Sequence, residues 1–132
     1  MADLNLVLVT PETTLFDRPV KSIRLPMFDG GAGIYPGRAP LVGRLGVGEL
    51  RLEPVDGASE QFFIDGGFVQ VKGRTVSVLT NSAQSVSDID RAEAQAELEA
   101  AVAERAIGDE AAEALAHRQD RARKLVSLAS GR

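Results

Sequence analysis

The sequence predicts an antiparallel β-sandwich or barrel of short strands, followed by an antiparallel two-helix hairpin. Eleven of the 13 glycines and all six prolines precede Ser87, where short apolar segments alternate with turn residues. After Ser87 there is no proline, and alanine becomes the commonest residue, as is typical of helices. We therefore predict a β-sandwich domain over residues 1–87 and a helical hairpin over residues 88–132.

The N-terminal part contains several segments with the two-residue periodicity of strands that bury one face. Pro26 and Pro54 each end one of these segments, and Asp56-Gly57 and Asp65-Gly66-Gly67 are typical hairpin turns. No helix-length segment separates the strands, which excludes a parallel architecture with helical crossovers. The predicted strands are residues 4–8, 20–25, 49–53, 61–64, 68–71 and 75–79.

Two helices are predicted in the C-terminal part, over residues 89–107 and 110–128. Gly108 ends the first helix in a left-handed conformation, and Asp109 caps the second. Residues 88–107 hold six acids and two bases, whereas residues 108–132 hold four acids and five bases. Neither helix has a strong apolar stripe, so we expect attraction between the acidic first helix and the basic second helix to contribute to their pairing. Two alternatives stay open: a stable hairpin exposed to solvent, and a loosely docked hairpin that can open.

The composition excludes several classes of function. Cysteine is absent and His117 is the single histidine, so thiolate sites, multi-histidine metal sites and cysteine nucleophiles are excluded. The pI near 5.0 argues against nucleic acid as the main partner. No apolar segment approaches the roughly 20 residues of a transmembrane helix, and the first residues lack the features of a secretion signal. We expect no catalytic residue and no bound metal or cofactor.

The glycine-rich segment at residues 30–33 is not a phosphate-binding loop, because no Gly-Lys-Ser or Gly-Lys-Thr follows it. We interpret these glycines as a tight connection between strands.

Three segments of the chain, in order, match the pattern of one known family. Residues 33–41 read Gly-Ile-Tyr-Pro-Gly-Arg-Ala-Pro-Leu, residues 63–71 hold a Gly-Gly corner between apolar strands, and residues 76–79 and 87–90 lead from sheet to helices. With these segments the chain resembles the epsilon subunit of the bacterial F-type ATP synthase over essentially its whole length.

The resemblance implies a non-catalytic subunit in the central stalk of a proton-translocating ATP synthase. Its β-sandwich would bind the gamma subunit and the membrane-embedded c-ring, coupling c-ring rotation to ATP synthesis in the catalytic head. Its hairpin would extend to the head subunits and inhibit ATP hydrolysis. The implied location is peripheral, at the cytoplasmic face of the bacterial inner membrane.

Within the family pattern, the c-ring and gamma contact falls on Asp29, Gly31, Tyr35 and Arg38. The family often has an acid where Gly31 stands and a histidine where Arg38 stands. Arginine keeps a hydrogen-bond donor but has a fixed charge, so pH sensitivity at this position is lost.

The family's ATP-binding motif is degenerate in this chain. Its positions are occupied by Ile89, Asp90, Glu93 and Ala94, and Glu93 puts a negative charge where an arginine is expected. We therefore predict weak or no ATP binding. The second predicted helix carries a basic cluster formed by Arg118, Arg121, Arg123 and Lys124, which is suited to bind phosphate, an acidic protein surface or anionic lipid, or to face the first helix. In the hairpin that the resemblance implies, we assign the regulatory part to this cluster.

A function from another class remains open at this point. The chain could be a stand-alone β-sandwich module that binds proteins and dimerises through its helices. That alternative predicts self-association, whereas the stalk hypothesis predicts a gamma partner at a coupling membrane.

Overall fold

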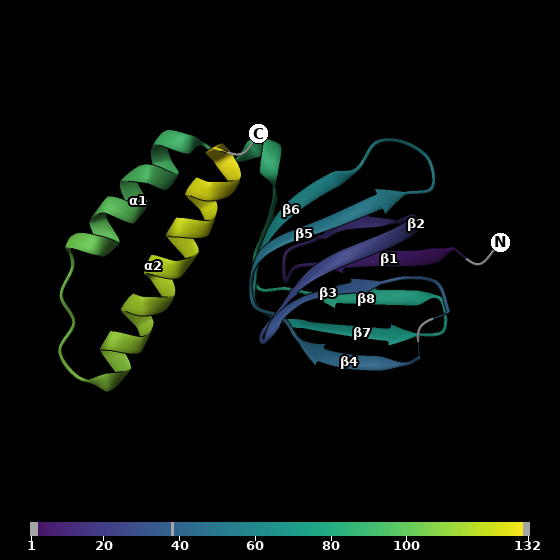
Figure 1. Cartoon of the computed structure of the whole chain (residues 1–132), viewed down its shortest axis with the longest axis horizontal. Helices are drawn as coiled ribbons and strands as arrows, with labels where there is room; N and C mark the ends of the chain where they lie inside the picture. Colours follow the sequence, from purple (N-terminus) through teal and green to yellow (C-terminus); the bar gives the residue numbers. More distant parts are fainter. Residues whose placement is uncertain (1–2, 38, 131–132) are drawn as a thin grey trace. The chain divides into compact units, whose positions relative to one another are not determined.

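Figure 1 shows the computed structural model of the chain, which describes residues 3–37 and 39–130. It divides into two compact units, residues 1–85 and residues 86–132. Strands build the first unit and helices the second, so the predicted fold class is confirmed. The division lies two residues before the boundary that the composition predicts.

Within the described residues, the first unit contains nine strands. Eight of them pair in the order β4-β7-β8-β1-β2-β5-β6-β9, and β3 pairs with β2. The strands are β1 (Leu4–Val9), β2 (Thr14–Met27), β3 (Gly30–Ile34), β4 (Leu41–Arg44), β5 (Val47–Pro54), β6 (Glu60–Asp65), β7 (Phe68–Lys72), β8 (Thr75–Leu79) and β9 (Ala83–Ser85).

The long strand β2 connects the two layers of this unit. Its residues 14–20 pair with β1, residues 23–27 pair with β3, and residues 20–24 pair with β5 along the opposite edge. In Figure 1, β2, β5 and β6 lie above β8, β7 and β4. All strand pairings in the first unit are antiparallel except that of β1 with β8, which is parallel. Local patterning cannot signal that exception because the two strands are distant in the chain.

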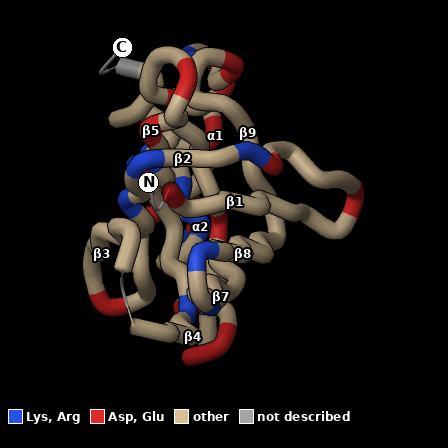
Figure 2. Tube along the Cα trace, turned by 90° about the vertical axis from the view of Figure 1, so that its right-hand side faces the viewer, with Lys and Arg blue, Asp and Glu red and all other residues tan. Residues whose placement is uncertain are grey.

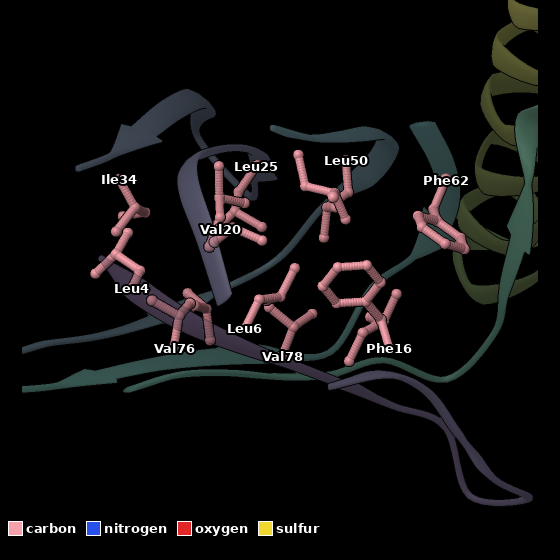
Figure 3. Packing of buried hydrophobic residues seen from close by; sticks show 14 of the residues in the cluster. Leu4, Leu6, Phe16, Val20, Leu25, Ile34, Leu50, Phe62, Val76 and Val78 are labelled. Atoms are coloured by element: carbon pink, nitrogen blue, oxygen red, sulfur yellow. The ribbon is translucent and has the colours of Figure 1, made fainter. Parts of the chain in front are cut away.

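The core of the first unit lies between the layers. Leu4, Leu6 and Leu8 are at most 1% exposed, as their alternation predicts, and they face side chains from β2, β5, β6, β7 and β8. Figure 3 shows these side chains pointing toward one another. Because apolar burial drives folding, this continuous cluster gives the unit a core of its own. The labelled members are Leu4, Leu6, Phe16, Val20, Leu25, Ile34, Leu50, Phe62, Val76 and Val78.

The second unit contains the short 3-10 helix η1 (Val86–Asp88), followed by α1 (Arg91–Ala103) and α2 (Asp109–Ser130). The first helix is shorter than predicted, because Asp90 caps it and Glu104 already has extended backbone angles. Gly108 adopts the expected left-handed conformation with φ +93°. Asp109 is the first residue of α2 rather than its cap. Among the described residues, neither helix is both long and apolar enough to cross a membrane.

The glycines that the sequence analysis interpreted as a tight connection form a strand instead. Gly30, Gly31 and Gly33 belong to β3, which pairs with β2, and the turn between the two strands is Phe28-Asp29. Glycine has no side chain to give a two-residue apolar periodicity, so this strand carries little signal of its own. The pairing with β2 satisfies its backbone groups and determines its conformation.

Candidate partner-binding surfaces

The residues predicted to contact the c-ring lie along β3. Asp29 precedes this strand at the exposed turn, Gly31 lies within it, and Tyr35 follows it. Five strand residues span about 17 Å, so Asp29 and Tyr35 lie at opposite ends of β3 and do not form one compact site. The ring of Tyr35 lies over Gly33, where an added Cβ would be 3.0 Å from the ring. Arg38 lies outside the described residues.

A contiguous apolar surface, which the sequence analysis missed, lies on the outer face of the β4-β7-β8 layer. Phe68 is directly opposite Leu79 on one side and Arg44 on the other. The Arg44 guanidinium lies 4.1 Å from the centre of the Phe28 ring, and the Phe28 amide donates to the Arg44 carbonyl. We call Phe28, Val42, Phe68 and Leu79, each more than half exposed, together with Arg44, the apolar patch.

The alternation of buried and exposed positions along β7 and β8 contains a sequence signal for the apolar patch. Phe68 alternates with the buried Val69 and Val71, so its side chain falls on the outward-facing positions of β7. Leu79 likewise follows the buried Val78 in β8. Large apolar side chains on outward positions of two paired strands are the observation that predicts such a surface.

In the hairpin, the basic cluster is engaged by acidic partners. Arg118 pairs with Glu104 at 2.7 Å, and Arg121 pairs with Glu97 at 3.4 Å. Because both pairs join α2 to α1 or to the segment after it, they hold the hairpin closed. A hydrogen bond also joins the two helices, because the Gln119 side-chain amide donates to the Ala101 carbonyl at 3.0 Å.

The other two members of the basic cluster are Arg123 and Lys124. Lys124 contacts Asp120 one turn earlier on α2 at 3.1 Å, and Arg123 is exposed. The hydrogen bond from Arg118 lowers the pKa of Glu104 below its ordinary 4.5, and the same bond raises the pKa of Arg118. The cluster therefore includes two arginines that pair with acids across the hairpin and a lysine that pairs with an acid on α2 itself.

The degenerate ATP motif has structural roles in this chain. Ile89 is buried, and the Asp90 side chain accepts from the Glu93 amide at 3.1 Å, which caps α1. Ala94 is buried as well. A hollow of about 300 Å³ lies between the helices, lined by Glu97, Ala100, Ala101, Arg118, Arg121 and Ala122. At that hollow the carboxylate of Glu97 pairs with the guanidinium of Arg121.

No group of three or more histidine or acidic side chains among the described residues is arranged to hold a metal ion. The surfaces described above present exposed apolar side chains and ion pairs, and exposed apolar patches are typical of contacts with other proteins.

Comparison with known proteins gives the family. The model of the "ATP synthase, Delta/Epsilon chain, beta-sandwich domain" family matches residues 3–86, which covers the strand-built unit from residue 3 and extends one residue beyond its end. The chain belongs to this family. Its resemblance to the epsilon subunit is thereby confirmed, and as an epsilon-type chain it is a component of the ATP synthase rather than a stand-alone binding module.

Individual relatives agree with this assignment. The ATP synthase epsilon chain of Rhodopirellula baltica is 50% identical over 91 residues, covering 69% of this chain and 70% of the relative. That of Carboxydothermus hydrogenoformans is 41% identical over 102 residues, covering 76% and 75%.

Solved structures confirm the fold of the epsilon-type chain. A chain of the Euglena gracilis mitochondrial ATP synthase has a TM-score of 0.87 at 24% identity, covering 96% of this chain and 81% of that one. A chain from the Tetrahymena thermophila mitochondrial ATP synthase has a TM-score of 0.74 at 16% identity, covering 96% of each.

Proposed function

We propose that this epsilon-type subunit is a non-catalytic part of the central stalk in a proton-translocating ATP synthase. It binds the gamma subunit and the c-ring, and it couples c-ring rotation to ATP synthesis in the catalytic head. The observation that carries the proposal is the exposed apolar patch, because apolar surfaces of this kind are typical of protein interfaces. Its partners hold the subunit at the cytoplasmic face of the bacterial plasma membrane as a peripheral protein.

We assign the gamma contact to the apolar patch. Phe28, Phe68 and Leu79 offer large side chains that gain from burial, and Arg44 offers a cation at their centre. The c-ring contact is assigned to the segment from Asp29 to Tyr35, which runs along β3 from the turn that Asp29 shares with Phe28.

The hairpin is proposed to be the regulatory part. Its interhelical ion pairs are largely exposed, and exposed pairs contribute little to stability and weaken with salt. The buried residues of α1 are the small Ala94 and Ala101, which bury little apolar area. A hairpin closed by such contacts can open at low cost, extend toward the catalytic head and inhibit ATP hydrolysis through its basic cluster.

We further propose that the hairpin does not bind ATP at physiologically useful affinity. Glu93 sits in the first turn of α1, and Arg118 and Arg121 already pair with Glu104 and Glu97. A triphosphate would have to displace both carboxylates. Titration calorimetry with Mg-ATP should show no binding in the micromolar range, and micromolar affinity would refute this part of the proposal.

The gamma contact is tested by binding the full chain to the gamma-containing catalytic head from its own source. Replacing Phe68 and Leu79 by serine should weaken binding about tenfold or more, since both residues lie at the centre of the apolar patch. The matched control replaces Leu15 and Val55 by serine, because both are exposed apolar residues outside the apolar patch. Circular dichroism of each variant verifies that it is folded.

Equal binding by both double variants would remove the apolar patch from the interface. If the folded wild-type chain did not bind the head at all, the stalk assignment itself would be wrong.

A further inference from the structure

Two arginines face each other directly on the outer face of the layer opposite the apolar patch. Arg24 on β2 is the cross-strand partner of Arg51 on β5, and both side chains are exposed. Side chains at such positions have their Cβ atoms only about 5 Å apart, and like charges placed there repel each other. No carboxylate among the described residues forms an ion pair with either guanidinium.

The acids nearest to Arg51 along β5 are bound elsewhere. Glu49 accepts a hydrogen bond from Gln61, and Glu53 accepts one from Ser22 at 3.5 Å. Both acids lie two residues from Arg51, on the same face of the strand. The two guanidiniums therefore present unused donors to the outside, between carboxylates that already have partners.

An aromatic ring extends this arginine pair toward β3. Gly33 is the cross-strand partner of Arg24 on its other side, and the Tyr35 ring covers Gly33. A single row across the outer face thus runs from Tyr35 through Arg24 to Arg51. The row begins in the segment that we assign to the c-ring contact, so the two surfaces are continuous.

We infer that this row binds acidic side chains on the loops of the c-ring, with the carboxylates received by Arg24 and Arg51 and flanked by Tyr35. Guanidinium groups bind carboxylates through two parallel hydrogen bonds, so an acidic partner satisfies the unused donors and relieves the repulsion between the arginines. The inference rests on the proposed function and specifies which chemistry the c-ring must offer.

The charge pattern favours protein carboxylates over a lipid surface. Segments that bind anionic lipids gather about four to eight basic residues, whereas here Arg51 lies between Glu49 and Glu53 on β5, and Arg24 on β2 is its only basic cross-strand partner. In Figure 2 acidic segments (red) and basic segments (blue) are interspersed over the view shown. A broad anionic surface would meet these acids as well as the arginines, while a single acidic side chain can reach the guanidiniums alone.

The test measures binding of the full chain to two assemblies from its own source, the gamma-containing catalytic head alone and the same head assembled with the c-ring in detergent. The wild-type chain should bind the second assembly more tightly, and this gain should shrink at high ionic strength. Arg24→Glu combined with Arg51→Glu should leave binding to the head unchanged and reduce affinity for the ring-containing assembly about tenfold or more.

The matched control is Lys72→Glu combined with Arg74→Glu, which changes the net charge equally at two exposed positions around the β7–β8 turn. It should keep the gain from the c-ring. If both double variants lose the gain in affinity for the ring-containing assembly, the gain depends on net charge rather than on Arg24 and Arg51, and the inference is wrong.

Other outcomes separate this inference from the proposed function. If the Arg24 and Arg51 variant retains the gain from the ring, or the wild-type chain shows no gain, the inference is wrong while gamma binding stands. If the variant loses affinity for the head alone, the arginines serve gamma instead. If vesicles of anionic lipid without a c-ring bind the wild-type chain through the same arginines, the occupant is lipid. A wild-type chain that binds neither assembly refutes the proposed function itself.

Discussion

At Gly67 two backbone segments come closer than any side chain allows. A Cβ there would overlap the Leu79 carbonyl oxygen and lie 2.7 Å from the Thr80 Cα, and the residue has φ +108°. The sequence shows this corner as Gly66-Gly67, which indicates a turn, but it does not show that a strand end passes directly behind it. The close approach is a property of the folded sandwich.

Replacing Gly67 by alanine should therefore destabilise the first unit severely. Gly57 is the matched control, because its φ is +119° and nothing lies within 4 Å of an added Cβ. We expect Gly57→Ala to cost about 1 kcal/mol through backbone strain. Gly67→Ala should cost roughly 2 kcal/mol more, since a steric overlap is added to the strain. Chemical denaturation followed by circular dichroism measures both, and equal losses would contradict the role of the overlap.

The ion pair of Glu104 with Arg118 predicts a pH dependence of the hairpin. Because the folded-state pKa of Glu104 lies below 4.5, the stabilisation from this pair is present above pH 4.5 and is lost as the pH falls through the lowered pKa. NMR titration of the Glu104 carboxyl should give a pKa below 4.5 in the wild type. In Arg118→Gln the pKa should return toward 4.5, and an unchanged value would exclude Arg118 as the cause.

At the scale of elements, the start of α1 is determined locally and its end is not. Asp90 is a good capping residue, and its side chain bonds to the Glu93 amide as its position predicts. The segment after Ala103 keeps helix-forming residues, yet Glu104 is extended and pairs with Arg118 on α2. The chain leaves the helix early because it must return to run along α2.

The cap at Asp90 can be tested by two substitutions that differ in whether they keep a side-chain oxygen. Asp90→Ala should lower the stability of α1 by about 1 kcal/mol, because the amide of Glu93 loses its acceptor. Asp90→Asn keeps a side-chain oxygen and should retain most of that stability. Hydrogen exchange of the α1 amides in the full chain measures the difference. Equal protection in the two variants would show that capping does not stabilise this helix.

The strands show the same division between local and tertiary causes. Strand β1 was predicted from the alternation of Leu4, Leu6 and Leu8, because those side chains face the core. Strand β3 was missed because its glycines carry no such alternation, and β4 and β9 are too short to show a period. Pairing with neighbours that are already ordered makes these segments strands.

At the scale of the whole molecule, the two units have separate contact networks. The first unit has its own buried cluster, and the family match ends at residue 86, next to the division between the units. The candidate surfaces for gamma and the c-ring lie in the first unit, and the basic cluster lies in the second. We therefore expect binding and regulation to be separable.

A chain that ends after Ser87 should fold and unfold in one cooperative transition, because the core of the first unit is complete without the helices. It should bind the gamma-containing head as well as the full chain does. Any inhibition of ATP hydrolysis by the full chain should disappear. Thermal unfolding, binding and ATPase assays measure the three effects, and lost gamma binding by the folded, shortened chain would place part of that interface in the hairpin.

The sequence by itself determined the fold class, the position of the main strands and the family, because these depend on local periodicity, turn residues and short motifs. Only the tertiary structure decided which exposed residues lie together. Phe28, Arg44, Phe68 and Leu79 come from four different places in the chain, and Arg24 meets Arg51 only through the register of β2 and β5. Surfaces for partners depend on strand pairing between distant segments, and that pairing is set by burial of the whole core rather than by any local pattern.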